Sequence, residues 1–220
     1  MRALIFDLDG TLVDTVYAHV FAWQRAFAEA GMTIGSWRIH RRIGTSGDLI
    51  TRAAERDLGR NIGSQEAETL QRRHRELFAE FLPDRRPLPG AVELLRFLRA
   101  SKISYGIATS AHRPEINPSL DALEIGDEAV VIEGGGVLRA KPEPDLFLAC
   151  QQRLGFPVED CYVVGDAVWD ILAARRAGML GIGLLSGGYS EDELSRAGAF
   201  RVYSDPRELH HSLDELGISP

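Results

Sequence analysis

The chain has 220 residues, 45% of them hydrophobic and 26% charged, a composition that fits one large α/β domain or a core with a small insert. The net charge is −7, and no basic stripe is interleaved with aromatic residues, which argues against a nucleic-acid surface. The longest apolar runs fall short of the ~20 residues of a membrane span, and no signal peptide is recognised. The two cysteines make no disulfide framework. We therefore expect a cytoplasmic protein that does not bind membranes.

The first predicted element is a short apolar run at residues 3–6, which leads into two aspartates, Asp7 and Asp9. Such a run predicts a buried parallel strand, and that strand delivers Asp7 to its carboxyl end, where open α/β sheets place their chemistry. Two carboxylates so close together repel each other. They are tolerated if a cation, a phosphoryl group or a shared proton lies between them.

An all-helical block is predicted at residues 15–85. Its helices are expected at residues 15–30, 48–58 and 64–81, and a segment rich in proline and arginine marks its exit as a hinge. Between residues 15 and 89 there are 12 arginines against 9 acidic residues. This excess favours an anionic substrate, although solvated helix faces explain the same pattern.

Helices and strands alternate from Gly90 onward, which predicts a doubly wound parallel sheet. The expected helices are residues 91–100, 115–123, 143–154 and 168–177, and the expected strands are residues 103–108, 129–132, 161–164 and 181–185. Because the first strand joins the same sheet, the predicted fold class is α/β, a doubly wound parallel, Rossmann-like core with an inserted all-helical cap. We expect residues 1–14 and 86–220 to form the core and residues 15–85 the cap.

Four polar signals follow predicted strands or precede predicted helices. They are Asp7 with Asp9, Thr109 with Ser110, Lys141, and the segment Gly165–Asp170. Phosphoryl transfer needs a nucleophile, a proton donor, hydroxyl and cationic clamps, and carboxylates for Mg²⁺, and these signals supply them. Each signal alone is explained by a turn, a helix cap or a solvated loop, but the four in this order indicate a catalytic site.

In the stretches 7–14, 108–110, 141–147 and 165–170 the chain resembles the haloacid dehalogenase-like hydrolase superfamily. Among its members, the chain is similar to helical-cap phosphatases of the phosphoglycolate phosphatase type and to β-phosphoglucomutase-like enzymes. The resemblance spans nearly the whole chain and includes the position of the cap after the first motif.

The resemblance makes Asp7 the nucleophile that attacks phosphorus and becomes an aspartyl-phosphate, and it makes Asp9 the acid and base. Thr109 would hold the phosphoryl oxygens, and Lys141 would offset the charge between Asp7 and the phosphate. Members that cleave carbon–halogen bonds look different at the position of Asp9, so an aspartate there favours phosphate esters. The same motifs supply further candidate substrate-binding residues, namely Gly10, Thr11 and Ser110.

The resemblance also implies one Mg²⁺ ion. It would be held by Asp7, by Asp9 through its carbonyl, and by Asp166, with Asp170 supporting it directly or through water. A bound Mg²⁺ would remove the penalty of crowding these carboxylates.

The segment Arg38–Gly47 is the part of the cap that we expect to face the site. Its candidate substrate-binding residues are Arg41, Arg42, Gly44 and Thr45, and the alternative is an interhelical turn with surface arginines. His19, on the first cap helix, is a further candidate substrate-binding residue. Its position favours a hinge or packing role over a catalytic one.

The predicted function is Mg²⁺-dependent hydrolysis of a small phosphorylated metabolite through an aspartyl-phosphate. The enzymatic alternative is a β-phosphoglucomutase-like isomerase, and the non-enzymatic one is a phospho-accepting signalling module similar to a two-component receiver. A receiver places its aspartate after a central strand of the chain rather than the first and carries no comparable insert. A binding protein on an inactive core is a third alternative, which the complete set of acids disfavours. The sequence predicts no particular protein partner.

Overall fold

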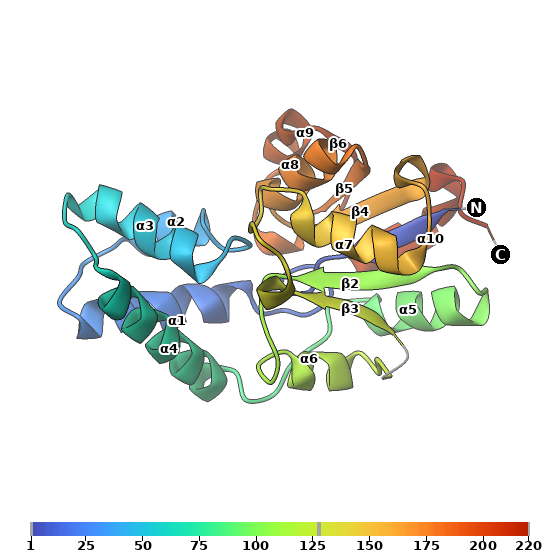
Figure 1. Cartoon of the computed structure of the whole chain (residues 1–220). Helices are drawn as coiled ribbons and strands as arrows, with labels where there is room; N and C mark the ends of the chain where they lie inside the picture. The colour runs from blue at the N-terminus through green and yellow to red at the C-terminus, as the bar shows by residue number, and fades with distance from the viewer. Residues whose placement is uncertain (1, 127–128, 220) are drawn as a thin grey trace.

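A single parallel sheet forms the centre of the computed structural model, which describes residues 2–126 and 129–219. Its strands are hydrogen-bonded in the order β3-β2-β1-β4-β5-β6 (Figure 1). The strands are β1 (Ala3–Phe6), β2 (Tyr105–Thr109), β3 (Val130–Glu133), β4 (Cys161–Gly165), β5 (Leu180–Leu184) and β6 (Ala199–Tyr203). Because β1 lies between β2 and β4, the carboxyl ends of these three strands meet at one edge, the place where doubly wound sheets bind ligands.

Alternate side chains of β1 pack on opposite faces of the sheet, as the two-residue period of a strand requires. Leu4 and Phe6 belong to the buried cluster under the helices α5 (Ala91–Ala100), α6 (Asn117–Ala122) and α10 (Pro206–His211). Ala3 and Ile5 belong to the cluster under α7 (Asp145–Leu154) and α8 (Val168–Ala177). The strand is apolar throughout because helices cover both of its faces.

The segment between β1 and α5 forms a helical block with its own buried core. Its helices are α1 (Val16–Glu29), α2 (Ser36–His40), α3 (Gly47–Leu58) and α4 (Ser64–Phe81). Apolar side chains of these helices, including Phe27, Ile50 and Leu77, pack together in a cluster separate from those of the sheet. In Figure 1 the block lies beyond the carboxyl edge of the sheet, where it can cover the site.

The predicted fold class is confirmed: the core is a doubly wound parallel sheet, and the cap is helical and inserted after the first strand. The residue limits of core and cap stay a prediction. The described residues contain no helix that is both long and apolar enough to cross a membrane.

Several elements in the cap and in the second half of the chain were missed from the sequence. They are α2, β6, α9 (Glu191–Ala197) and α10, together with 3-10 turns at Gly134–Gly136, Val158–Asp160, Leu185–Gly187 and Leu213–Leu216. Strand β6 is an edge strand with Arg201 at its centre and two exposed positions, so it carries no continuous apolar run. Helix α2 is too short to display a hydrophobic period.

Candidate active site

Three buried aspartates meet at the carboxyl edge of the sheet. Asp7 follows β1 directly, and its backbone N–H donates to the Val164 carbonyl of β4 at 2.9 Å. Asp166 follows β4, and Asp170 lies in the first turn of α8. One carboxylate oxygen from each of Asp7, Asp166 and Asp170 lies within 4.8 Å of the others. The structure therefore brings together the three carboxylates to which the family resemblance gives a part in metal binding.

Lys141 is the only ammonium group in this cluster within the described part of the chain. Its Nζ lies 2.6 Å from Oδ1 of Asp7 and 2.8 Å from Oδ1 of Asp170, and the side chain is fully buried. Burial alone would lower the pKa of Lys141, but the charges of Asp170 and Asp7 outweigh burial and raise it. The lysine is thus held as a cation between two carboxylates, one of them the predicted nucleophile.

The cluster carries more negative charge than Lys141 can neutralise. Burial raises the pKa of Asp7 to about 7, against the opposing charge of Lys141. Burial, followed by the charges of Asp170 and Asp7, holds the pKa of Asp166 well above its ordinary value. When all three carboxylates are ionised, one ammonium leaves two negative charges uncompensated, and oxygen donors in this number suit Mg²⁺. The residues present therefore fit the predicted ion.

The turn after β1 brings the backbone close to Asp166. Gly10 adopts φ +82°, and a Cβ at this position would collide with the Asp166 carboxylate and with Val16. Thr11 donates from its hydroxyl to Oδ1 of Asp166 at 2.8 Å. Both residues shape the acidic cluster, so the structure gives Thr11 a partner among the predicted metal ligands rather than a free hydroxyl facing a substrate.

Thr109 and Ser110 extend from the end of β2 beside Asp7. The Thr109 hydroxyl oxygen accepts a hydrogen bond from the Ala111 N–H at 3.1 Å, which leaves its own proton available as a donor. Ser110 donates from Oγ to the Gly44 carbonyl of the cap at 3.3 Å. Thr109 therefore has the geometry of an oxygen clamp, while Ser110 joins core to cap.

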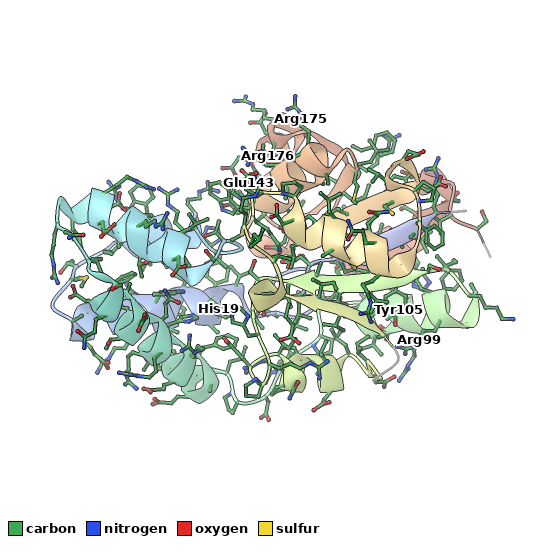
Figure 2. The ribbon with its side chains drawn as sticks, viewed as in Figure 1. His19, Arg99, Tyr105, Glu143, Arg175 and Arg176 are labelled. Carbon is green, nitrogen blue, oxygen red and sulfur yellow. The ribbon has the colours of Figure 1, made fainter. Side chains whose placement is uncertain are left out.

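Asp9 points toward the cap rather than toward the other aspartates. Its Oδ1 accepts from the Thr15 hydroxyl at 2.8 Å and lies 3.6 Å from Nε2 of His19. Burial would raise the pKa of Asp9, but His19 and Thr15 outweigh burial and hold it below the ordinary value. His19 lies where the helical block meets the sheet (Figure 2). The structure thus brings His19 to the predicted acid, a contact that the sequence did not predict.

A cavity of about 110 Å³ separates cap from core, with Asp7, Asp9, Thr109 and Lys141 on its core side. Of the predicted cap residues, His19, Gly44 and Thr45 line it. Sequence reasoning missed several polar residues of its wall, which are Gln71, His74, Arg75, His112 and Glu115. The three residues of α4 stand next to no recognisable motif, and His112 and Glu115 follow the 108–110 motif without belonging to it, so only the packing of α4 and of the loop after β2 against the site reveals them.

Arg41 and Arg42 are not brought into this cavity, which corrects the expectation that they face the substrate. The Arg41 guanidinium lies 2.6 Å from a carboxylate oxygen of Glu193 and over the ring of Tyr189. The Arg41 carbonyl accepts from the Trp169 indole at 3.1 Å. Both arginines line a separate surface hollow beside Trp169 and Tyr189. The local sequence could not show this, because Glu193 and Tyr189 lie about 150 residues further along the chain.

His74 is a buried histidine of α4 that stacks on Trp23, with ring centroids 4.4 Å apart, and bonds to His19. Burial, then the charges of His19 and Arg75, hold the pKa of His74 well below the ordinary 6.5. Below pH 6.5, His74 therefore binds a proton in the unfolded chain but not in the folded chain, so the free energy of unfolding falls as pH decreases.

We expect His74→Phe, which keeps the stacking on Trp23, to remove this pH dependence. Between pH 6.5 and 5.5 the wild type should lose about 1 kcal/mol more unfolding free energy than the variant. Urea denaturation of both proteins in EDTA at each pH measures the difference. Parallel losses in the two proteins would show that His74 is protonated in the folded state.

A strand-end nucleophile candidate, a buried ammonium, a hydroxyl clamp and a carboxylate cluster under a helical cap suit an enzyme of phosphoryl transfer. A family model described as haloacid dehalogenase-like hydrolase matches residues 1–178. The chain is 31% identical to a phosphoglycolate phosphatase of Rhodospirillum rubrum over 100% of this chain and 96% of that protein. It is 29% identical to a β-phosphoglucomutase of Bacillus subtilis, over 85% and 84% of the two chains.

Among solved structures, a hydrolase from Pseudomonas syringae superposes with a TM-score of 0.94 at 43% identity, covering 98% of this chain and 99% of that one. The protein therefore belongs to the haloacid dehalogenase-like hydrolase family, as its sequence motifs predict. It is an enzyme, a phosphatase of that family.

Proposed function

We propose that the chain hydrolyses the phosphate monoester of a small metabolite in a Mg²⁺-dependent reaction, with Asp7 as the nucleophile. The observation that carries this proposal is the contact of Lys141 with both Asp7 and Asp170 inside a buried carboxylate cluster. An ammonium in that place directs an anionic phosphoryl group toward Asp7, whose carboxylate attacks phosphorus without the help of a base.

Asp9 is proposed as the acid and base of the reaction. It first protonates the leaving oxygen and then accepts a proton from the water that hydrolyses the aspartyl-phosphate. Its low pKa suits the second step. For the first, the negative charge of a bound phosphoryl group raises the pKa of the neighbouring Asp9. Thr15 and His19 orient the Asp9 carboxylate toward the cavity.

The metal would be held by Asp7, by the Asp9 carbonyl and by Asp166, with Asp170 in support. A bound Mg²⁺ supplies charge stabilisation for the phosphoryl oxygens. Thr109, with its free hydroxyl proton, holds one of these oxygens, and Lys141 balances the charge that builds up on them.

The size of the cavity favours a compact substrate. Its volume of about 110 Å³ equals that of roughly four water molecules at about 30 Å³ each, which suits a phosphorylated two- or three-carbon compound better than a hexose phosphate. Arg75 and His112 line the same cavity, so the leaving group would have a guanidinium group and an imidazole as neighbours. We therefore propose a small phosphorylated acid, with 2-phosphoglycolate as the first compound to test.

Phosphate release from a panel of esters tests this substrate class and the isomerase alternative together. The panel holds 2-phosphoglycolate, p-nitrophenyl phosphate and β-glucose 1-phosphate. We expect the highest kcat/KM for 2-phosphoglycolate. Conversion of β-glucose 1-phosphate into glucose 6-phosphate without phosphate release would instead support the isomerase alternative. The similarity to the β-phosphoglucomutase of Bacillus subtilis is the reason for testing it.

Removal of Mg²⁺ is expected to abolish turnover. Incubation with excess EDTA should bring phosphate release to background, and added Mg²⁺ should restore it, because two uncompensated charges then face the phosphate. Asp166→Ala should raise the Mg²⁺ concentration required for half-maximal activity more than the control Glu143→Ala does. Glu143 is a surface carboxylate that pairs with Arg176. Undiminished activity in EDTA would contradict the proposal.

A further inference from the structure

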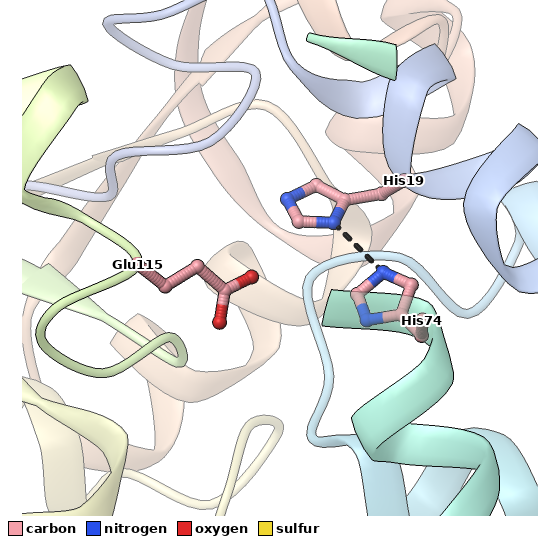
Figure 3. A group of neighbouring side chains, drawn as sticks. All are labelled: His19, His74 and Glu115. Carbon is pink, nitrogen blue, oxygen red and sulfur yellow. Dashed lines mark hydrogen bonds between the residues drawn. The ribbon is translucent and has the colours of Figure 1, made fainter. Parts of the chain in front are cut away.

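A second cluster of metal-binding side chains lies in the cavity wall, apart from the three aspartates. It comprises His19 of α1, His74 of α4 and Glu115 of the loop between β2 and α6. One donor atom of each lies within 4.8 Å of the others, and the two histidines are buried. Figure 3 shows the Glu115 carboxylate pointing toward the two imidazole rings.

The geometry points to a transition-metal site, and we propose that His19, His74 and Glu115 bind Zn²⁺. Two imidazole nitrogens and one carboxylate oxygen form a ligand set that zinc sites use, with a fourth position left for water. That fourth position would face the cavity, because all three residues line it. Mg²⁺ prefers oxygen ligands, so the two clusters differ in the ion they select.

The two rings are already arranged for a shared ligand. Nδ1 of His19 lies 3.0 Å from Nε2 of His74, so one proton now joins the two nitrogens that would bind the metal. The other nitrogen of His19, Nε2, faces Oδ1 of Asp9 at 3.6 Å. A carboxylate on the far nitrogen of a histidine fixes the tautomer whose near nitrogen is free to bind metal. For His74 to bind in turn, the proton on its Nε2 moves to Nδ1.

The protonation of the ligands and their position on both cap and core also support the proposed site. The low pKa of His74 keeps its imidazole neutral, the form that binds metal. Burial raises the pKa of Glu115 against the opposing charges of His19, Arg75 and His112, and a bound cation would favour its ionised form. Because two ligands belong to the cap and one to the core, a bound Zn²⁺ would hold the cap against the core at the mouth of the active site.

The test measures Zn²⁺ binding to the full chain by isothermal titration calorimetry in saturating Mg²⁺, which occupies the aspartate cluster. We expect one equivalent of Zn²⁺ to bind to the wild type. His74→Ala and Glu115→Gln should each weaken binding at least about 10-fold, since even outer partners of metal ligands contribute this much. His112→Ala is the matched control, because His112 lines the same cavity outside the cluster. It should bind Zn²⁺ like the wild type.

Co²⁺ provides a second readout that does not depend on affinity alone. Visible absorption of tetrahedral Co²⁺ should appear with the wild type and the His112 variant and should be absent with Glu115→Gln. Because Glu115→Gln keeps the shape of the side chain, it provides the test even if His74→Ala fails to fold. Absence of Zn²⁺ binding by the wild type would overturn the proposal. So would equal binding by all variants, or an equal loss in the His112 control. Each of these outcomes leaves the phosphatase proposal standing, because none involves turnover.

Discussion

Asp7→Asn is expected to abolish turnover while leaving the fold intact. The amide cannot attack phosphorus, and loss of the nucleophile in a covalent hydrolase costs on the order of 10⁶ in kcat, so we expect a loss of at least about 10³-fold. Folding should be unaffected, because burial already disfavours the Asp7 charge and Lys141 keeps its contact with Asp170. Phosphate release and thermal unfolding, measured on the same preparation, check both parts.

Asp121→Asn is the matched control, since Asp121 is exposed on α6, away from the site. It should retain wild-type activity. If Asp7→Asn kept more than about a tenth of the wild-type rate, Asp7 would not be the nucleophile, and another carboxylate of the cluster would have to take that role.

Lys141→Met is expected to reduce both stability and activity strongly. The variant leaves Asp7 and Asp170 without their ammonium partner, and breaking a buried ion pair in this way costs about 3–5 kcal/mol of unfolding free energy. The loss should grow as pH rises, because carboxylates with raised pKa values are then forced to ionise in the folded state. Urea denaturation at several pH values measures it.

The other lysine of the chain supplies the control. Lys102 is exposed, so Lys102→Met should change stability by less than about 0.5 kcal/mol. Added Mg²⁺ should restore part of the stability lost by Lys141→Met, because an ion that binds only the folded state stabilises it. A Lys141 variant as stable as the Lys102 variant, with or without Mg²⁺, would mean that the carboxylates are protonated and need no cation.

The sequence determined the elements whose signal is local. The buried run at residues 3–6 ends at Asp7, and the run that forms β4 ends just before Asp166, so parallel strands had to bring both aspartates to one edge. The helical block was equally readable, because its longer helices have an apolar period and a clear end. The pairing of Lys141 with Asp7, 134 residues apart, was expected only through the family resemblance.

Only the tertiary structure decided the contacts of those polar side chains whose neighbours in the sequence do not indicate a partner. Arg41 could face a phosphate or a carboxylate with equal chemical sense, and the packing of the cap beside α9 gave it Glu193. In the sequence, nothing distinguishes His74 from the other residues of an amphipathic helix, and only the packing of α4 against α1 brings it to His19. Hydrophobic periodicity fixes which face of an element is buried, but the partner of a polar group depends on how elements distant in sequence come together.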